Sequence, residues 1–442
     1  MAAAQSAIVS PCGMLSGVLS VPGDKSISHR VAILSSLSRG TSSIRNFLHS
    51  EDCISTMRAM EALGARVYRT ANDDVRIEGA CGKLMQPADD LDVGNSGTTI
   101  RLLSGVAAAQ PMTVVLTGDQ SLCSRPMKRI KDPLEQMGAS VELTGEKGTA
   151  PIRITGGRLH AVDYVLPVAS AQVKSCVLFA AMYAEGMTTI IEPAPTRDHT
   201  ERLLRGMGID IGVEKHIVQV QGFGPAGPPL KARHWYVPGD FSSAAFLILA
   251  AASKPGSDIT MEGVGLNPRR TAFLDVLRRM GADISAERTS EASEPEPYGR
   301  IHVRGASLKG ANVGGDEIPN LIDELPLVAA AGALANGRTV IRDAAELRVK
   351  ESDRIAAMAA NLASLGVEVE EMDDGMVVHG PADLAIPPSG VRSYGDHRIA
   401  MAMAVLGLFA PSDLCINNVS CVDTSYPGFW KDLRRLGADV DL

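Results

Sequence analysis

The stretch VPGDKSISHR at residues 21–30 returns as VPGDFSSAAF at residues 237–246, with charged residues after the turn in the first copy and none in the second. In both copies a Pro-Gly-Asp turn precedes a serine-containing segment. Asp and Ser are residue types that cap the free N–H groups of a first helical turn. The two copies therefore predict equivalent helix starts in an internally repeated chain.

A second phrase occurs six times along the chain. In each copy an amphipathic helix ends at a Gly and an alternating strand follows, as in EALGARV and RRLGADV. Gly at this place predicts a left-handed residue just beyond the helix end. The glycines are Gly64, Gly138, Gly208, Gly281, Gly366 and Gly437. Another helix and a strand are predicted before each of these helices, so the repeating unit is helix, strand, helix, strand, turn, strand.

The length of 442 residues exceeds what one compact core usually holds. Two domains of three repeats each are therefore expected, with the Pro-Gly-Asp turns as the crossing points. One domain comprises residues 24–237, and the other combines residues 1–23 with residues 238–442. Two such crossings suit a hinge that closes on a ligand. The stretch SEASEPEPYG at 290–299 is interpreted as a solvated acidic loop.

Composition excludes several classes of function. The net charge is −8 and the basic residues are scattered, which argues against nucleic acid or a membrane surface as a partner. The longest apolar runs, such as LPLVAAAGALA at 325–335, are too short to span a bilayer. Seven cysteines without a CxxC pair, and an N-terminus without a signal-peptide pattern, favour reduced thiols in the cytoplasm. The histidine and glycine spacings indicate neither a metal site nor a dinucleotide cofactor.

Polar residues gather at the predicted starts of the first helix of each repeat. Ser, Asn or Asp occurs at nearly all of these starts, where free N–H groups and helix dipoles favour anions. The cations near them are Lys25, Arg30, Arg125, Arg197, Lys350, Arg354 and Arg398. Taken singly, the serines and asparagines fit helix caps and the arginines fit solvated faces. Their equivalent positions in the repeat favour a site for ligands that carry phosphates and carboxylates.

One cation cluster includes two carboxylates. VKESDR at 349–354 places Lys350 and Arg354 on one face of a predicted helix, with Glu351 as their neighbour. Asp323 begins the preceding helix of the same repeat. From spacing alone, the carboxylate of Glu351 is equally well a structural ion-pair partner or a proton carrier.

Motifs along nearly the whole chain resemble those of the 5-enolpyruvylshikimate-3-phosphate synthase (EPSP synthase) family. They are PGDKSISHR (22–30), GNSGTTIRL (94–102), SRPM (124–127), ASAQVKS (169–175), TRDHTE (196–201), IDELP (322–326), LRVKESDR (347–354) and DHRIAMA (396–402). GDKSISHR, SAQVKS and TRDHTE are similar to the class II branch of that family. The resemblance implies an α/β fold: a two-domain inside-out α/β barrel of the enolpyruvyl transferase type. Its six βαβαββ repeats, three per domain, would point helix N-termini at an interdomain cleft.

The resemblance also implies a reaction. The enolpyruvyl group of phosphoenolpyruvate would pass to the 5-hydroxyl of shikimate 3-phosphate, with release of phosphate, on the route to chorismate and the aromatic amino acids. Neither a cofactor nor a metal is implied, and relatives are mostly monomers. The family is the target of glyphosate, and insensitive class II relatives carry alanine where this chain has Gly97.

Site residues follow from the matching motifs. Shikimate 3-phosphate would be held by Lys25, Ser26, Arg30, Ser170, Gln172, Arg197, Asp323 and Lys350. Phosphoenolpyruvate would be held by Lys25, Gly97, Arg125, Gln172, Arg354 and Arg398. Asp323 would accept the proton of the 5-hydroxyl, and Glu351 would help to protonate the methylene carbon, assisted by Lys25.

The chain departs from the family pattern at three positions. Ala171 replaces a second serine, so that only its backbone can bind there. Glu346 stands in the place of an asparagine, and Thr424 in the place of a lysine that binds phosphoenolpyruvate in class I enzymes. Positions 346 and 424 are therefore left out of the predicted site.

Two other functions are compatible with parts of the pattern. The UDP-N-acetylglucosamine enolpyruvyl transferases share the fold and the donor, but their cysteine lies several residues before an arginine. Here Cys123 lies only two residues before Arg125, and DKSISHR favours a shikimate phosphate. The chain could also be a catalytically idle domain of a pathway complex, against which the intact set of candidate acids and cations argues.

Overall fold

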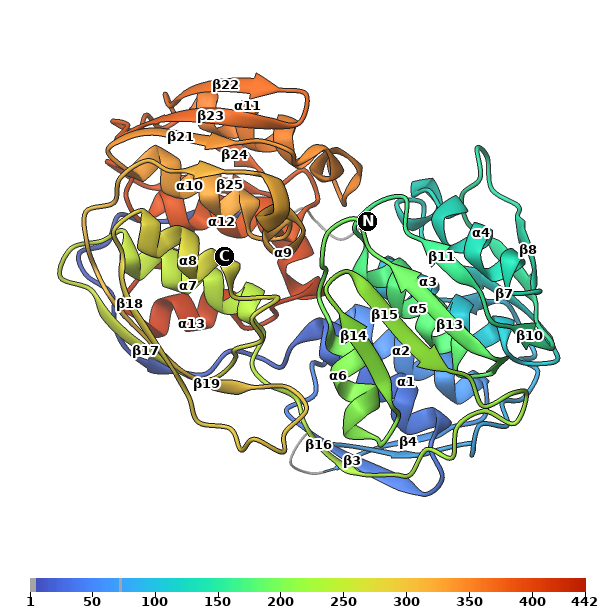
Figure 1. The fold of residues 1–442 in the computed structure, drawn as a ribbon. Coiled ribbons are helices and arrows are strands. Elements are labelled where there is room, and N and C mark those ends of the chain that lie inside the picture. Colours follow the sequence, from blue (N-terminus) through green and yellow to red (C-terminus); the bar gives the residue numbers. More distant parts are fainter. Residues whose placement is uncertain (1–4, 71–73) are drawn as a thin grey trace. The chain divides into compact units, whose positions relative to one another are not determined.

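The computed structural model describes residues 5–70 and 74–442, which divide into two units (Figure 1). Unit 2 comprises Gly23–Val237 together with Ala292–Glu296. Unit 1 comprises the chain up to Pro22, Pro238–Glu291 and Pro297–Leu442. The sequence analysis placed the two domain boundaries after residues 23 and 237 and left all of 238–442 in one domain.

The acidic stretch at 290–299 differs from its prediction as a solvated loop. Glu296 within it is only 4% exposed and belongs to unit 2, where its Oε1 lies 2.7 Å from Nδ1 of His199. The high density of acidic residues in the stretch had indicated solvation. That local pattern could not reveal a histidine nearly a hundred residues away in the chain that pairs with one of the carboxylates.

Each repeat contains two main helices. The first helices are α1 (Lys25–Leu37), α3 (Gly97–Ala108), α5 (Ala171–Ala181), α7 (Phe241–Ala252), α10 (Leu325–Leu334) and α12 (His397–Gly407). The second helices are α2 (Glu51–Ala62), α4 (Lys128–Gln136), α6 (His199–Gly206), α8 (Ala272–Arg279), α11 (Arg354–Ser364) and α13 (Phe429–Arg435). The glycine predicted after each second helix has a positive φ, between 80° and 107°, which confirms the predicted helix ends.

Side chains cap most of the first helices. The capping oxygens belong to Asp24, Ser96, Ser170, Asp240 and Asp396, each of which accepts an N–H of the first turn. Helix α10 differs, because Pro326 lies in its first turn and has no N–H to satisfy. A short helix, α9 (Ile318–Leu321), precedes it. The remaining helical segments are short 3₁₀ turns at Leu122–Ser124, Gly315–Glu317, Ala345–Val349 and Val419–Thr424.

Each repeat also contributes to a four-stranded sheet. In unit 2 the first sheet has the spatial order β16 (His234–Tyr236), β3 (Thr41–Arg45), β5 (Val75–Glu78), β4 (Arg66–Arg69). The second sheet has the order β6 (Leu91–Asp92), β7 (Thr113–Thr117), β9 (Ile152–Thr155), β8 (Ser140–Leu143). The third sheet has the order β11 (Asp163–Val165), β13 (Met187–Ile191), β15 (Ile217–Gln221), β14 (Ile211–Glu214). A further pair joins β10 (Leu159–His160) to β12 (Ala184–Glu185).

The sheets of unit 1 follow the same plan. The first has the order β18 (Asp283–Arg288), β19 (Tyr298–Arg304), β17 (Asp258–Gly265), β2 (Ser16–Leu19). The second has the order β20 (Asn312–Val313), β21 (Gly337–Ile341), β23 (Gly375–Gly380), β22 (Glu368–Met372). The third has the order β24 (Val391–Arg392), β25 (Leu414–Asn417), β1 (Ala7–Val9), β26 (Val440–Asp441). In every one of these sheets one outer pair is parallel and the other pairs are antiparallel.

Strands β2 and β16, which precede the two VPGD turns, pair with strands of another repeat. Strand β6 leads into α3 and pairs with β7 of the same repeat. In contrast, β2 leads into α1 but pairs with β17, and β16 leads into α7 but pairs with β3. The two VPGD turns follow these exchanged strands, so they mark the places where the chain leaves one unit for the other.

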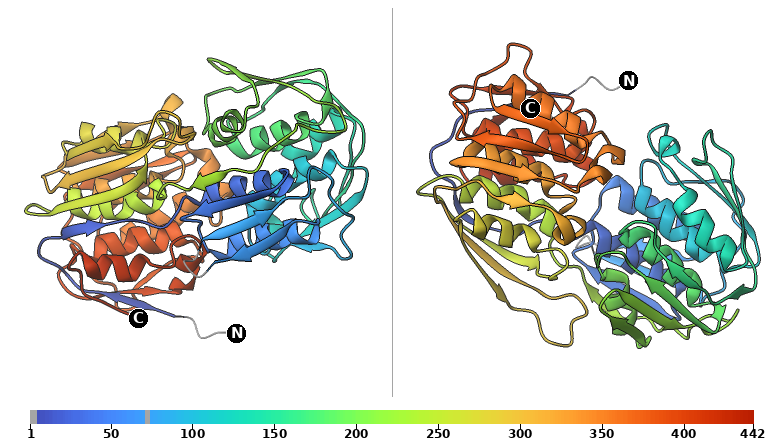
Figure 2. Two further views of the ribbon diagram at one scale, coloured as in Figure 1. Left: turned by 90° about the horizontal axis from the view of Figure 1, so that it is seen from below. Right: turned by 45° about the horizontal axis from the view of Figure 1, so that its top comes forward.

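The first helices form the core of each unit. In unit 1, α7, α10 and α12 contact one another and each packs on its own sheet, and the sheets lie on the outside (Figure 2). Helix α7 is buried along its whole length, and α10 is buried from Leu325 to Ala333, as expected for helices that are apolar on all sides. In the described part of the chain no helix has both the length and the apolar composition needed to cross a membrane.

The first VPGD turn depends on its glycine. A Cβ added to Gly23 would lie 1.9 Å from the backbone oxygen of Asn46. We expect Gly23→Ala to lower the free energy of unfolding by about 1–3 kcal/mol, the usual cost of overpacking, as measured by urea denaturation. Gly157→Ala is the control, because no atom lies within 4 Å of its added Cβ. Equal unfolding midpoints for the two variants would contradict the steric account.

Candidate active site

In unit 2 the N-terminus of α1 carries a lysine held by a carboxylate. Lys25 is the first residue of α1, and its Nζ lies 3.1 Å from Oδ2 of Asp52 on α2. The side chain of Lys25 is 18% exposed and that of Asp52 is 14% exposed. A cation at a helix N-terminus opposes the dipole, so the neighbouring carboxylate offsets an unfavourable placement. The sequence analysis had not assigned Asp52 to the site.

The N-terminus of α3 is covered by an arginine. A Cβ added to Gly97 would lie 2.9 Å from Nη1 of Arg125, so the guanidinium group lies directly against this glycine. Nη2 of Arg125 donates to Oδ1 of Asn95 at 2.6 Å. Asn95 in turn donates through Nδ2 to both carboxylate oxygens of Asp119, at 3.0 and 2.8 Å. The amide fixes the guanidinium group against α3.

A glutamine connects α3 with α5. Nη1 of Arg101 donates to Oε1 of Gln172 at 2.5 Å, and Nε2 of Gln172 donates to Oγ1 of Thr98 at 3.0 Å. Ser170 caps α5 through the N–H of Val173 at 3.4 Å. Arg101 was not among the residues predicted for the site. Its position one helical turn after Gly97, within the motif GNSGTTIRL, was the signal that could have identified it.

Arg30 links three helices of unit 2. Its Nε and Nη2 each donate over 2.7 Å, to the hydroxyls of Thr200 on α6 and Ser175 on α5, and Nη1 donates to the carbonyl of Ser26 at 2.9 Å. Burial lowers the pKa of Arg30 to about 10, although the charge of Glu201 opposes this shift. The group therefore remains a cation at neutral pH.

In unit 1, one buried arginine contacts three carboxylates. The guanidinium group of Arg354 is 1% exposed, with Nε 2.8 Å from Asp396, Nη1 3.3 Å from Asp323 and Nη2 2.6 Å from Glu351. Burial alone lowers its pKa, but the charges of Asp396, Glu351 and Asp323 raise the pKa above the usual value. Arg354 thus brings the two candidate proton carriers, Asp323 and Glu351, onto one guanidinium group.

A second arginine contacts the same region of unit 1. Nη1 of Arg398 donates to the carbonyl of Asp323 at 2.9 Å, and its Nε lies 3.5 Å from Oδ1 of that residue. Glu324, which is fully buried, accepts from the hydroxyl of Ser242 and lies 3.8 Å from Arg398 and 3.9 Å from Arg270. The N-termini of α7, α10 and α12 are therefore joined by one network.

The prediction for VKESDR is wrong in its geometry. Residues 350–353 are not helical, because the cap Asp353 accepts the N–H of Ala356 and α11 begins only at Arg354. Lys350 and Arg354 therefore do not share a helical face. Glu351 is nevertheless a neighbour of Arg354, as expected. Burial, with the charge of Arg354, lowers the pKa of Lys350, and the charge of Asp323 opposes that shift.

Comparison with known proteins decides the family. The chain matches the EPSP synthase (3-phosphoshikimate 1-carboxyvinyltransferase) family over residues 9–433. The chain belongs to the EPSP synthase family. A 3-phosphoshikimate 1-carboxyvinyltransferase of Akkermansia muciniphila is 52% identical over 430 residues, covering 95% of this chain and 97% of that protein. One of Desulforamulus reducens is 48% identical over 432 residues, covering 97% and 99%.

Solved structures agree with this assignment and with the predicted fold class. An EPSP synthase from Acinetobacter baumannii is 41% identical, with a TM-score of 0.87 over 99% of this chain and all of that one. The enolpyruvyl transferase NikO from Streptomyces tendae has a TM-score of 0.81 at 19% identity, covering 99% and 98%, which shows a shared fold. The two-domain enolpyruvyl transferase fold expected from the sequence is confirmed.

The predicted site residues are divided between the two units. Those in unit 2 are Lys25, Ser26, Arg30, Gly97, Arg125, Ser170, Gln172 and Arg197. Those in unit 1 are Asp323, Lys350, Glu351, Arg354 and Arg398. Among the residues described, no group of three or more His, Cys, Asp or Glu side chains is arranged to hold a metal ion. Thr424, outside the predicted site, donates to the carbonyl of Cys421 at 2.7 Å.

The pair of Arg354 with Asp396 predicts a pH dependence of stability. The charge of Arg354 lowers the pKa of Asp396 even though burial raises it. A carboxylate with a lowered folded-state pKa stabilises the protein above its unfolded pKa, and this contribution is lost as the pH falls. We therefore expect the free energy of unfolding to decline below about pH 4.

Asp396→Asn should reduce that acid-side decline and destabilise the protein by about 3–5 kcal/mol at neutral pH, because a buried cation loses its partner. Asp353→Asn is a matched control, since Asp353 is also a helix cap paired with an arginine but is 38% exposed. Denaturant unfolding as a function of pH measures both. If the free energy of unfolding of Asp396→Asn declined below about pH 4 as steeply as that of the wild type, the role given to this pair would be contradicted.

Proposed function

We propose that this chain transfers the enolpyruvyl group from phosphoenolpyruvate to the 5-hydroxyl of shikimate 3-phosphate and releases inorganic phosphate. The family match over residues 9–433 supports this activity, as do relatives of about half-identical sequence that carry the name of this transferase. The observation that carries the site assignment is the gathering of cations and carboxylates at capped helix N-termini within each unit.

The assignment of substrates to residues uses both groups of side chains. Shikimate 3-phosphate is held by Lys25, Ser26, Arg30, Ser170, Gln172, Arg197, Asp323 and Lys350. Phosphoenolpyruvate is held by Lys25, Gly97, Arg125, Gln172, Arg354 and Arg398. Planar guanidinium groups suit bidentate contact with carboxylate and phosphate, and free first-turn N–H groups add to the attraction. Both substrates are anions, so the cations also neutralise the charge that the substrates bring together.

Arg354 has a more limited role in this assignment than its charge suggests. Its guanidinium group is 1% exposed and already contacts Asp323, Glu351 and Asp396. Binding of phosphoenolpyruvate to Arg354 would require the substrate to share or replace one of these carboxylates. Its position therefore also supports a role in holding the two proton carriers in place.

The reaction requires a base and an acid. Asp323 accepts the proton of the 5-hydroxyl while that oxygen attacks the substituted carbon of phosphoenolpyruvate, and Glu351, assisted by Lys25, delivers a proton to the methylene carbon. Loss of phosphate, together with a proton from the new methyl group, restores the carbon–carbon double bond. Fixing both substrates beside these groups supplies the orientation that the addition needs.

The molecule that accepts the enolpyruvyl group distinguishes the proposed function from its alternatives. A phosphate-release assay with phosphoenolpyruvate and either shikimate 3-phosphate or UDP-N-acetylglucosamine should give turnover only with the shikimate compound. Turnover only with the sugar nucleotide would support the related transferase, and no turnover with either would support an idle domain. We further propose that the protein acts as a monomer in the cytoplasm, which light scattering coupled to size exclusion and cell fractionation would test.

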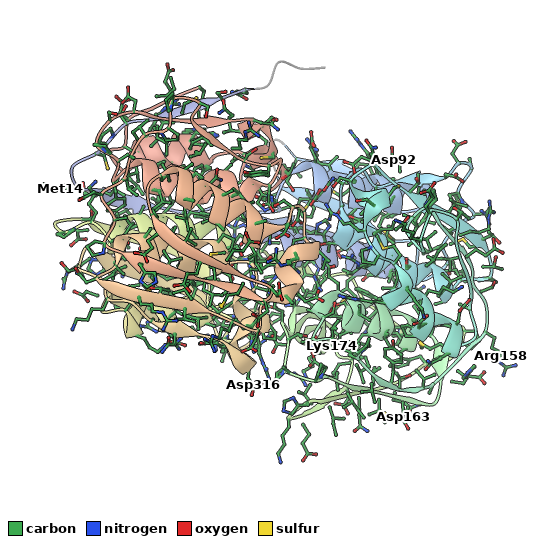
Figure 3. All side chains as sticks on the ribbon, turned by 90° about the horizontal axis from the view of Figure 1, so that it is seen from above. Met14, Asp92, Arg158, Asp163, Lys174 and Asp316 are labelled. Carbon is green, nitrogen blue, oxygen red and sulfur yellow. The ribbon has the colours of Figure 1, made fainter. Side chains whose placement is uncertain are left out.

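Asp323→Asn tests the proposed base. The amide keeps the size of the side chain but cannot accept the proton, so turnover should fall by roughly 10²–10⁴-fold. The Kd for shikimate 3-phosphate should stay within about tenfold of the wild-type value, because the amide can still form a hydrogen bond in place of the carboxylate. Asp316→Asn is the control, since Asp316 is an exposed carboxylate of the same unit (Figure 3). Near-normal turnover in Asp323→Asn would place the base elsewhere.

Gly97→Ala tests the proposed phosphoenolpyruvate site. The new methyl group would lie 2.9 Å from Nη1 of Arg125, so the guanidinium group must shift away from α3 to make room for it. Glyphosate is longer than phosphoenolpyruvate, and its inhibition constant should rise more than the KM for phosphoenolpyruvate. Steady-state inhibition kinetics measure both quantities. Equal increases would argue against steric selection at this helix N-terminus.

A further inference from the structure

A fully buried lysine on α5 has no role in the proposed reaction. Lys174, labelled in Figure 3, is 1% exposed. Its Nζ lies 3.0 Å from Oε2 of Glu192 and 2.7 Å from Oε1 of Glu201, and these carboxylates are 4% and 1% exposed. Removing three charges from water is costly, and burial of ion pairs seldom increases stability over an apolar alternative. The cluster therefore calls for an explanation other than stability.

One side of this cluster leads to Arg197. Glu192 follows strand β13, and its Oε1 accepts the N–H of Thr196 at 3.1 Å and the hydroxyl of Thr196 at 2.5 Å. Thr196 immediately precedes Arg197. The ammonium group of Lys174 holds one oxygen of Glu192, while the other oxygen holds the turn that carries Arg197.

The other side leads to Arg30. Glu201 lies on α6 next to Thr200, whose hydroxyl accepts from Nε of Arg30 at 2.7 Å. Ser175, the residue after Lys174, accepts from Nη2 of the same arginine at 2.7 Å. The charge of Glu201 therefore acts both on Lys174, through a direct ion pair, and on Arg30.

We propose that Lys174 is a positioning residue for shikimate 3-phosphate. By holding Glu192 and Glu201 on one ammonium group, it fixes α5, α6 and the turn before Arg197, and so places Arg197 and Arg30 for the anionic groups of this substrate. The inference rests on the proposed function, because the roles of these two arginines are assigned there.

Lys174→Met tests the proposal with Leu178→Ala as a matched control. Leu178 lies one turn further along α5 and is fully buried, so its truncation destabilises the same helix by forming a cavity while every charged group of the cluster stays in place. The Kd for shikimate 3-phosphate, measured by calorimetry, should rise on the order of 10–100-fold in Lys174→Met, as happens when a supporting partner is removed at metal sites. It should stay near the wild-type value in Leu178→Ala. At saturating substrate, kcat should change little.

A double variant separates positioning from stability. Lys174→Met leaves two buried carboxylates opposite one arginine, so the variant is expected to lose stability. Adding Glu192→Gln removes one negative charge and retains an oxygen that accepts from Thr196. The melting temperature should then recover, whereas the Kd for shikimate 3-phosphate should remain raised because the clamp is still absent. Recovery of binding together with stability would overturn the proposal.

Arg197→Ala distinguishes failure of the inference from failure of the site assignment. If Arg197→Ala weakens shikimate 3-phosphate binding and Lys174→Met does not, the positioning role alone is overturned. If Arg197→Ala has no effect, the site assignment is overturned and the positioning role with it. Weakened binding in Arg197→Ala, Lys174→Met and the double variant, with wild-type binding in Leu178→Ala, supports both.

Discussion

The N–H groups of a helix's first turn have no partner within the helix, and a buried N–H without a partner is costly. This chain meets the constraint at the start of the first helix of every repeat. At each start a capping oxygen accepts one or two of these N–H groups, or, in α10, a proline removes one, and the others stay available to a ligand. Beyond the first turn, α7, α10 and α12 of unit 1 consist of Ala, Gly and larger apolar residues, so their polar side chains are concentrated near one end. The enolpyruvyl transfer chemistry is proposed for the groups at that end.

The exchange of β2 and β16 explains why VPGD occurs twice. Each copy ends an exchanged strand, caps a first helix with its Asp, and carries the chain into the other unit. The charges differ because the two helix starts find their partners differently. Helix α1 brings its own cation, Lys25, whereas the start of α7 receives Arg270, whose Nη2 donates to the hydroxyl of Ser242 at 2.8 Å.

The repeat could be predicted because its signals are local in the sequence. Partners that are distant in the sequence could not be predicted. A Gly that must turn left-handed and a Ser or Asp that must cap a helix are visible from neighbouring residues alone, so helix ends and the repeat could be derived. The helix assumed across VKESDR was wrong because Asp353 starts a helix where the pattern suggested its middle. The carboxylates of Asp52, Glu296 and Asp396 were missed because each pairs with a residue far away in sequence. The sequence predicted a crossing between domains at each VPGD turn, but not the strands with which β2 and β16 pair.

Two of the missed carboxylates, Asp52 and Asp396, share one physical role with Asp323. Lys25 and Arg354 are the first residues of α1 and α11, and Arg398 is the second residue of α12, so each cation stands where the helix dipole disfavours positive charge. Each lies beside a carboxylate: Asp52 at 3.1 Å from Lys25, Asp396 at 2.8 Å from Arg354, and Asp323 at 3.5 Å from Arg398.

These carboxylates neutralise the same cations that anionic substrates would neutralise on binding. A substrate that binds such a cation must therefore compete with a protein carboxylate, and the competition depends on solvent access. It is weakest at Lys25, whose side chain is 18% exposed, and strongest at Arg354, which is 1% exposed and contacts three carboxylates. The same pairing that makes cations tolerable at helix N-termini thus separates a partly exposed cation, Lys25, from a buried one, Arg354, that holds the proposed proton carriers Asp323 and Glu351.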